Sequence, residues 1–292
     1  MRRSMLFLPG NNPNMIVGGG YLGADSIILD LEDAVSPDDK DAARKLVRNA
    51  LRSVSFGKCE VIVRINALDT LYWEEDVETI VPLCPDLIMP TKVSGAEYIR
   101  QLDEKLAGVE AAHGLPIGKT RLLPLLETAL GIENAFAIAS ASPRIAALFL
   151  GAEDLSADLR CPRTKEGAEI AYARGRIVCA ARAAGVEVYD APFTDVEDME
   201  GLEADARLAK GLGFTGKAVI SPRHVDTVNE VFSPSAAEIA YAREVFAAIE
   251  EAKRQGKGDI SLHGKMIDAP IVQRARLVLE AAAEIEGGIA DA

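Results

Sequence analysis

Short apolar runs recur along the chain and alternate with longer segments of mixed polarity. Each run is shorter than an ordinary helix and is bounded by polar residues, glycine or proline. Runs of this kind, separated by helix-length segments, are typical of buried parallel strands in an α/β protein. The predicted strands are Ser4–Leu8, Ser26–Leu31, Glu60–Ile65, Leu87–Met89, Leu122–Leu126, Ile145–Leu150, Val186–Tyr189 and Lys217–Ile220.

Helical patterns fill most of the intervals between these strands. Ser36 followed by Pro37 is a helix-start signal, with Ser36 as the N-cap, for a helix that ends near Ser53. Eight strands alternating with helices predict a (β/α)₈ TIM barrel. A doubly wound open sheet is the alternative, but no G-x-G-x-x-G follows the first strand.

Beyond the last strand the pattern becomes purely helical. Helices are expected over Ser235–Arg254 and Asp268–Ala283, and a Gly/Lys-rich linker, Gln255–Gly258, separates them. We therefore expect a catalytic barrel over residues 1–232 and a C-terminal helical extension over residues 233–292. The linker would allow that extension to act as a lid.

Charged residues gather where the predicted strands end. These residues are Asp30, Glu32, Asp33, Arg64, Lys92, Glu127, Asp154 and Asp190. Barrel enzymes build their sites at this face. Adjacent strands lie roughly 5 Å apart, so Glu127 and Asp154 can converge on a hard divalent cation such as Mg²⁺, near Gly151. A pair of loop acids that face water is the alternative interpretation.

Composition narrows the class of partner. The chain has 292 residues and a formal net charge of −13, which argues against nucleic acid or an anionic membrane as partner. No apolar run reaches membrane-spanning length, and the N-terminal run is too short for a signal peptide, so we expect a cytoplasmic protein. The four cysteines show no CxxC spacing, which favours reduced thiols.

Several segments together carry a family resemblance. They are Arg3–Gly10 (RSMLFLPG), Asp30–Val35 (DLEDAV), Arg64–Asp69 (RINALD), Gly151–Leu155 (GAEDL), Gly213–Lys217 (GFTGK) and Ser261–Pro270 (SLHGKMIDAP). They resemble the citrate lyase β-subunit family, within the wider HpcH/HpaI aldolase and malyl-CoA lyase superfamily. The resemblance runs in order along nearly the whole chain.

The resemblance implies an oxo-acid lyase with a TIM barrel that assembles as a homotrimer or hexamer. Its cofactor would be Mg²⁺, with Mn²⁺ as the alternative metal. In the citrate lyase complex the substrate is citryl thioester on an acyl carrier protein, which is cleaved to oxaloacetate and acetyl thioester beside the other lyase subunits. A free-standing citramalyl-CoA or malyl-CoA lyase or thioesterase, with acyl-CoA as substrate, is the second hypothesis, and a non-catalytic scaffold subunit is the third.

The resemblance also implies roles for individual residues. Glu127 and Asp154 match the metal ligands, and Arg64 matches the arginine that binds the oxo-acid carboxylate. Asp268 matches an aspartate on a C-terminal segment that reaches the active site of an adjacent subunit in the malyl-CoA lyase branch. The substrate-binding loop would contain Gly151, Ala152 and Glu153.

Carbon–carbon cleavage requires one proton to leave the substrate hydroxyl and another to reach the enolate. Asp268 is the predicted acid, although Asp268-Ala269-Pro270 also reads as a helix start. Glu32, Asp33 or a metal-bound water would take the hydroxyl proton. Lys92 is a strand-end candidate, but it follows Pro90-Thr91 where relatives commonly show Pro-Lys directly, so the alternative is a side chain that points elsewhere. Tyr98 is predicted to be a packing residue.

A basic segment just beyond the metal loop is a candidate docking site for an acidic carrier protein. Its members are Arg160, Arg163, Lys165, Arg174 and Arg176. The alternative is a solvated helix face whose charge is balanced by neighbouring glutamates.

Overall fold

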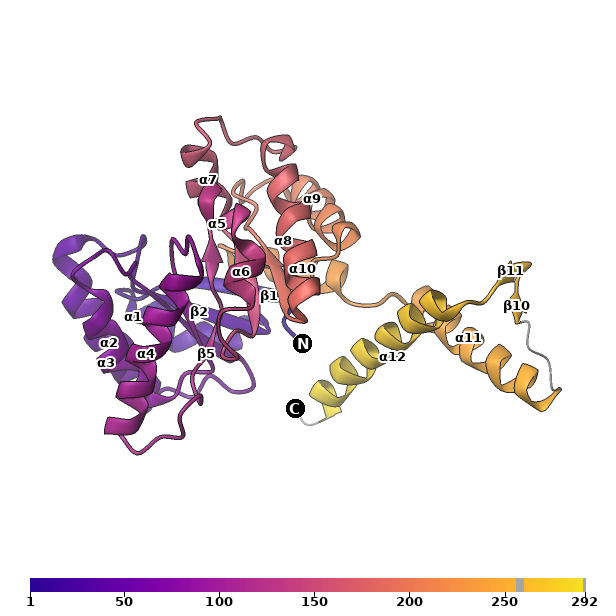
Figure 1. Ribbon diagram of the computed structural model, residues 1–292, viewed down its shortest axis with the longest axis horizontal. Coiled ribbons are helices and arrows are strands. Elements are labelled where there is room, and N and C mark those ends of the chain that lie inside the picture. The colour runs from indigo at the N-terminus through magenta and orange to yellow at the C-terminus, as the bar shows by residue number, and fades with distance from the viewer. Residues whose placement is uncertain (256–259, 291–292) are drawn as a thin grey trace. The chain divides into compact units, whose positions relative to one another are not determined.

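A computed structural model describes residues 1–255 and 260–290 and divides the chain into two compact units. The larger unit runs from Arg2 to Glu230, and the other contains Met1 and the residues from Val231 onward. Figure 1 shows the strands of the larger unit and the long helices of the smaller one.

Nine strands of the larger unit form one sheet, and every pair of neighbouring strands in it is parallel. The order is β5-β4-β3-β2-β1-β9-β8-β7-β6. The bounds are β1 Ser4–Pro9, β2 Ser26–Asp30, β3 Glu60–Ile65, β4 Leu87–Pro90, β5 Arg121–Leu122, β6 Leu125–Leu126, β7 Ala147–Leu150, β8 Glu187–Asp190 and β9 Gly216–Val219. Each predicted strand thus overlaps an observed one, which confirms the α/β prediction.

The two ends of this sheet meet in one short segment of chain. β5 and β6 stand at opposite ends of the strand order, yet only Leu123 and Pro124 separate them. The backbone N–H of Leu123 donates to Ile88 of β4, and the carbonyl of Pro124 accepts from Phe149 of β7. The sheet is therefore curled, consistent with a TIM-barrel-like fold.

The single strand predicted over Leu122–Leu126 is wrong, because it is two strands of two residues each. Pro124 has no backbone N–H to donate to a neighbouring strand, which explains the interruption.

Helices connect most of the strands. Their bounds are α1 Pro13–Gly18, α2 Lys40–Ser53, α3 Trp73–Ile80, α4 Ala96–Ala112, α5 Ala129–Glu133, α6 Ala135–Ala139, α7 Ala152–Asp158, α8 Ala171–Ala184, α9 Met199–Leu212 and α10 Val225–Phe232. The predicted end of α2 at Ser53 is confirmed. Ser36 does occupy the N-cap position, but of a 3₁₀ turn, Pro37–Asp39, that leads directly into α2, and its hydroxyl donates to the Asp39 carboxylate and does not accept a backbone N–H.

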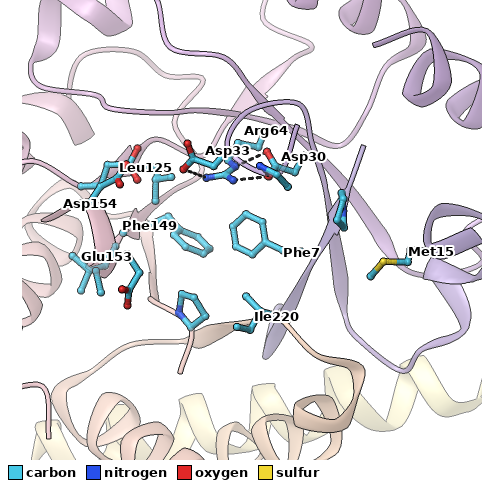
Figure 2. Close-up of a pocket in the computed structure, with 17 residues that line it drawn as sticks. Phe7, Met15, Asp30, Asp33, Arg64, Leu125, Phe149, Glu153, Asp154 and Ile220 are labelled. Carbon is cyan, nitrogen blue, oxygen red and sulfur yellow. Dashed lines mark hydrogen bonds and ion pairs between the residues drawn. The ribbon is translucent and has the colours of Figure 1, made fainter. Parts of the chain in front are cut away.

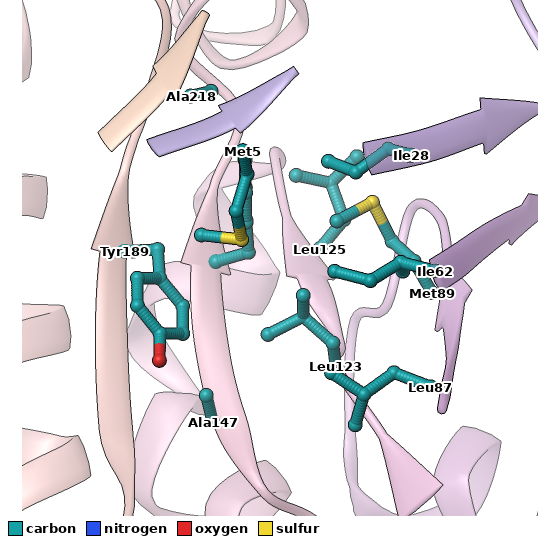
Figure 3. Packing of buried hydrophobic residues seen from close by; sticks show 11 residues of the cluster. Met5, Ile28, Ile62, Leu87, Met89, Leu123, Leu125, Ala147, Tyr189 and Ala218 are labelled. Carbon is teal, nitrogen blue, oxygen red and sulfur yellow. The ribbon is translucent and has the colours of Figure 1, made fainter. Parts of the chain in front are cut away.

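Alternate side chains of the strands fill the interior of the sheet with an apolar cluster (Figure 3). Its buried members are Met5, Ile28, Ile62, Leu87, Met89, Leu123, Leu125, Ala147, Phe149, Tyr189 and Ala218. This packed interior leaves no room for a site inside the curled sheet. The polar residues that could form a site therefore lie at the ends of the strands.

The smaller unit pairs two long helices, α11 Ala236–Arg254 and α12 Ala269–Ala290. Ser235 and Glu238 form a capping box at the start of α11. The hairpin of β10 Ser261–Leu262 and β11 Lys265–Met266 lies between the helices in sequence. The helix α12 extends past its predicted end at Ala283. Residues 256–258 of the predicted linker lie outside the described residues.

Of the helices in the described ranges 1–255 and 260–290, none combines the length and apolar character needed to cross a membrane.

Candidate active site

A pocket of about 470 Å³ lies where several strands of the sheet end. Phe7, Leu125, Phe149, Pro192 and Ile220 form much of its apolar wall. Its charged lining residues are Asp30, Asp33, Arg64, Glu127, Glu153 and Asp154. Figure 2 shows the guanidinium of Arg64 between Asp30 and Asp33, with the rings of Phe7 and Phe149 beside one another.

Arg64, at the end of β3, is held by Asp30 at the end of β2. Arg64 Nε lies 2.7 Å from Asp30 Oδ1, and its NH2 lies 2.5 Å from Oδ2. The Asp30 carboxylate also accepts from the backbone N–H groups of Glu32 and Ala34, so it fixes both the arginine and the loop. Burial disfavours the charged guanidinium, but the neighbouring carboxylates raise the pKa of Arg64 above its usual value.

The NH1 group of Arg64 points toward two further acids. It lies 3.2 Å from Glu32 Oε2 and 3.6 Å from Asp33 Oδ2. The Glu32 side chain is 8% exposed and the Asp33 side chain 57%. Of the acids in this loop, Asp30 therefore organises the backbone, Glu32 is enclosed, and Asp33 faces solvent.

Glu127 follows β6, and Asp154 lies in the first turn of α7, which follows β7. Gly151, just before α7, permits a close approach: a Cβ there would lie 2.6 Å from Glu127 Cβ and 2.7 Å from its Oε2. Burial, with the charge of Asp154 as a further contribution, raises the pKa of Glu127 to about 8.

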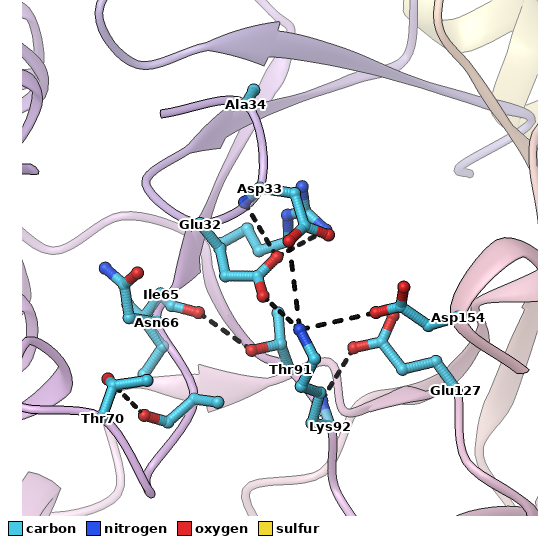
Figure 4. A network of polar contacts seen from close by, with 12 residues as sticks. Glu32, Asp33, Ala34, Ile65, Asn66, Thr70, Thr91, Lys92, Glu127 and Asp154 are labelled. Carbon is cyan, nitrogen blue, oxygen red and sulfur yellow. Dashed lines mark hydrogen bonds and ion pairs between the residues drawn. The ribbon is translucent and has the colours of Figure 1, made fainter. Parts of the chain in front are cut away.

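Lys92 joins these two groups of acids (Figure 4). Its Nζ lies 2.6 Å from Glu32 Oε1, 3.4 Å from Asp154 Oδ2 and 3.9 Å from Asp33 Oδ1. Its backbone N–H donates to Glu127 Oε1 at 2.8 Å. The side chain of Lys92 therefore points into this group of acids, and the alternative that it points elsewhere is wrong. Its place two residues after β4 is the signal in the sequence for this position.

Tyr98 also differs from its predicted role as a packing residue. Its hydroxyl donates to the carbonyl of Thr91 at 2.7 Å and accepts from the backbone N–H of Leu68 at 2.9 Å. Tyr98 therefore anchors the peptide that precedes Lys92. Nothing in the local sequence signals this contact, because Tyr98 lies on α4.

Asp190 does not join the pocket acids, although it is the last residue of β8. It is fully buried in ion pairs with Arg174, at 2.8 Å, and with Lys217, at 2.6 Å. Both cations also pair with Asp205. Arg174 is therefore not available to a carrier protein, and its place in the predicted docking segment is wrong.

The remaining members of that basic segment are partly engaged. Arg163 pairs with Glu169 and Glu153, and Lys165 pairs with Asp195 and Asp198. This pairing agrees with the alternative of a surface whose charges are balanced locally.

Asp268 belongs to the smaller unit and begins α12. Its exposed carboxylate accepts from the backbone N–H of Ile271 at 3.1 Å, so the helix-start interpretation describes its local geometry. The predicted role of Asp268 in proton transfer stays a prediction.

The Glu127–Asp154 pair fits a divalent cation. In the described part of the chain, no three or more His, Cys, Asp or Glu side chains gather as a metal site. Asp154 Oδ2 is buried and accepts no hydrogen bond, its contact with the Lys92 ammonium being an ion pair at 3.4 Å, and Glu127 is a buried acid beside it. Two hard oxygen ligands suit Mg²⁺, which usually completes its coordination with water and substrate oxygens.

Comparison with known proteins assigns the chain to a family. The profile of the HpcH/HpaI aldolase/citrate lyase family matches residues 3–222. Citrate lyase subunit beta of Leuconostoc mesenteroides subsp. cremoris is 45% identical over 97% of this chain and 93% of its own length. The L-malyl-CoA/beta-methylmalyl-CoA lyase of Rhodobacter capsulatus is 35% identical over 97% of this chain and 95% of its own length.

A solved structure of a relative has a similar fold. The citrate lyase beta subunit of M. tuberculosis complexed with oxaloacetate and magnesium is 30% identical, with a TM-score of 0.67 over 80% of this chain and 97% of that one. A family profile that spans most of the sequence, together with these relatives, establishes that the chain belongs to the HpcH/HpaI aldolase/citrate lyase family.

Proposed function

We propose that this chain is the β subunit of a citrate lyase. It would cleave citryl thioester on an acyl carrier protein to oxaloacetate and acetyl thioester. The observation that carries the proposal is one pocket lined by both Arg64 and the Glu127–Asp154 pair. A cation for carboxylate recognition and a pair of metal-binding acids are the two elements that this cleavage needs.

Mg²⁺, with Mn²⁺ as the alternative, would be held by Glu127 and Asp154 and would supply positive charge to the oxygens of the oxo-acid half of the substrate. The M. tuberculosis relative described above binds magnesium together with oxaloacetate. The Oδ2 atom of Asp154, which is buried and accepts no hydrogen bond, supports this assignment.

Arg64 would bind the substrate carboxylate through NH1, because Asp30 already engages Nε and NH2. A guanidinium fixed from one side presents its remaining N–H groups in a defined direction, which a flexible ammonium does not. Gly151, Ala152 and Glu153 line the same pocket next to Asp154 and would contact the oxo-acid half.

Two proton transfers accompany the cleavage. Glu32 or Asp33 would accept the hydroxyl proton; burial raises the pKa of Glu32, although Arg64 and Lys92 oppose this shift. The electron pair of the broken carbon–carbon bond passes to the thioester as an enolate, and Asp268 would return a proton to that carbon. We infer that the extension over residues 233–292 acts as a lid on a (β/α)₈ barrel and delivers Asp268.

The proposed partners are the other citrate lyase subunits and the carrier protein, within a homotrimeric or hexameric assembly of this chain. A free-standing malyl-CoA or citramalyl-CoA lyase or thioesterase is the second candidate. The similarity to the Rhodobacter capsulatus enzyme favours keeping it.

A substrate panel separates these candidates. Citryl thioester on carrier protein, citryl-CoA, citramalyl-CoA and malyl-CoA would each be incubated with the full chain, with Mg²⁺ and with EDTA. Metal-dependent oxaloacetate release that prefers the carrier-bound citryl group supports the β-subunit proposal. Cleavage restricted to malyl-CoA or citramalyl-CoA supports the second candidate, and inactivity on all four leaves a scaffold.

A further inference from the structure

One residue contacts both of the acids assigned to the cation. The backbone N–H of Lys92 holds Glu127, while its ammonium faces Asp154 from 3.4 Å. The ammonium is closer to Glu32, at 2.6 Å, so Glu32 is its stronger partner. Lys92 therefore makes two kinds of contact. Its backbone N–H forms a hydrogen bond with Glu127, and its ammonium pairs more closely with Glu32 than with Asp154.

The backbone of Lys92 is in the left-handed region, with φ of 53°. This conformation costs a non-glycine residue about 1 kcal/mol or more, and it persists where the surroundings determine it. Tyr98 holds the preceding carbonyl of Thr91, and Val93 donates its backbone N–H to Leu125. This conformation, held from both sides, places the N–H of Lys92 at Glu127 and its ammonium at Glu32 and Asp154.

We propose that Lys92 is a positioning residue that neutralises Asp154 in the cation-free protein and releases it when a divalent cation binds. Its ammonium then stays paired with Glu32, and its N–H keeps Glu127 oriented. This inference rests on the proposed function, because it takes Glu127 and Asp154 as the cation ligands. In this role the Lys92 ammonium competes with the divalent cation for Asp154 and does not contact the substrate.

The sign of the effect follows from charge. A fixed ammonium next to Asp154 repels an incoming dication and competes with it for the carboxylate. Removing the ammonium while keeping the backbone N–H should therefore tighten cation binding. We expect the Kd for Mg²⁺ to fall by about tenfold, which corresponds to about 1.4 kcal/mol.

The test is calorimetric titration of the full chain with Mg²⁺ alone, without substrate. Lys92→Met removes the charge and keeps the length of the side chain, whereas Lys92→Gly removes it and also suits the left-handed backbone. Lys92→Arg keeps the charge. Lys105→Met is the matched control, since Lys105 also pairs with two carboxylates, Glu74 and Glu78, neither of which lines the pocket.

Tighter Mg²⁺ binding by both uncharged variants, with Lys92→Arg and Lys105→Met close to wild type, supports the proposal. Melting curves should agree, with Mg²⁺ raising the Tm more in the uncharged variants than in wild type. Unchanged or weaker binding by Lys92→Gly, in a wild type that does bind Mg²⁺, overturns the role of Lys92 alone. Absence of Mg²⁺ binding by the wild type overturns the proposed metal site as well.

Discussion

The carboxylate of Asp30 engages Arg64 through two parallel hydrogen bonds, of 2.7 Å to Nε and 2.5 Å to NH2. Asp30 is the last residue of β2 and Arg64 the last but one of β3, and they are direct partners in the register of the two strands. The ion pair is therefore built into the sheet rather than into a loop. Its orientation leaves NH1 of Arg64 directed at Glu32 and Asp33.

Asp30→Asn should destabilise the larger unit by roughly 3 kcal/mol, because it leaves the buried Arg64 without its charged partner. Denaturant unfolding can be followed by the fluorescence of Trp73, the single tryptophan, which is buried on α3. Asp33→Asn is the matched control, with an expected loss below about 1 kcal/mol, because Asp33 is exposed. Equal losses in the two variants would contradict this account.

Gly151→Ala should weaken Mg²⁺ binding by about tenfold or more. The new methyl group would lie 2.6 Å from Glu127 Cβ and would force that carboxylate to move. Calorimetry on the variant measures the effect. Gly175→Ala in α8 is the control: its methyl group meets no atom within 4 Å, and a helical Ala in place of Gly should stabilise by about 0.5–1 kcal/mol. Wild-type affinity in Gly151→Ala would show that the contact does not position Glu127.

Glu110 predicts an acid-dependent loss of stability. Burial alone would raise its pKa, but hydrogen bonds from Arg144 and from the backbone of Thr120 and Gly118 lower it to about 2. The folded state therefore holds the charged form more strongly than the unfolded state, whose Glu has a pKa of 4.5. This contribution is complete above pH 4.5 and disappears as the pH falls through about 2.

The measurement is the unfolding free energy of wild type and Glu110→Gln against pH. A difference on the order of 3 kcal/mol at pH 7 should shrink steadily below pH 4.5, because a protonated glutamate resembles glutamine. A difference that is independent of pH would mean that the charge of Glu110 contributes nothing.

The sequence predicted the strands well because buried parallel strands are continuous apolar runs. It predicted the pair Glu127 and Asp154 for the same reason, since both residues follow such runs closely. The interruption at Pro124 and the orientation of Lys92 escaped prediction. Both depend on backbone geometry that neighbouring segments impose, namely Ile88 and Phe149 in the first case and Tyr98 in the second.

Buried ion pairs were also beyond the sequence. The sequence places Asp190 at a strand end and Arg174 in a basic segment, and only the fold shows that they neutralise one another inside the larger unit. Arg174, which was predicted to belong to a basic docking surface, is therefore buried. Exposure cannot be read from charge alone when a partner lies 16 residues away.

Asp268→Asn separates helix capping from proton donation. Asparagine caps helices about as well as aspartate, so the variant should keep the wild-type melting temperature. Asparagine cannot donate the proton that we assign to Asp268, so the variant should lower kcat by about 100-fold or more. Steady-state kinetics and thermal melting on the same preparation give both readouts. Full activity in Asp268→Asn would remove this residue from the mechanism.

In the mechanism proposed here, Glu127 and Asp154 hold the cation that carbon–carbon cleavage requires. The most direct test is oxaloacetate release from carrier-bound citryl thioester as Mg²⁺ is increased, for wild type, Asp154→Ala and, as an exposed-acid control on α4, Glu97→Ala. Saturable, Mg²⁺-dependent release by wild type and Glu97→Ala, absent from a folded Asp154→Ala, is the predicted result. Release by Asp154→Ala with the Mg²⁺ dependence of wild type would contradict the account.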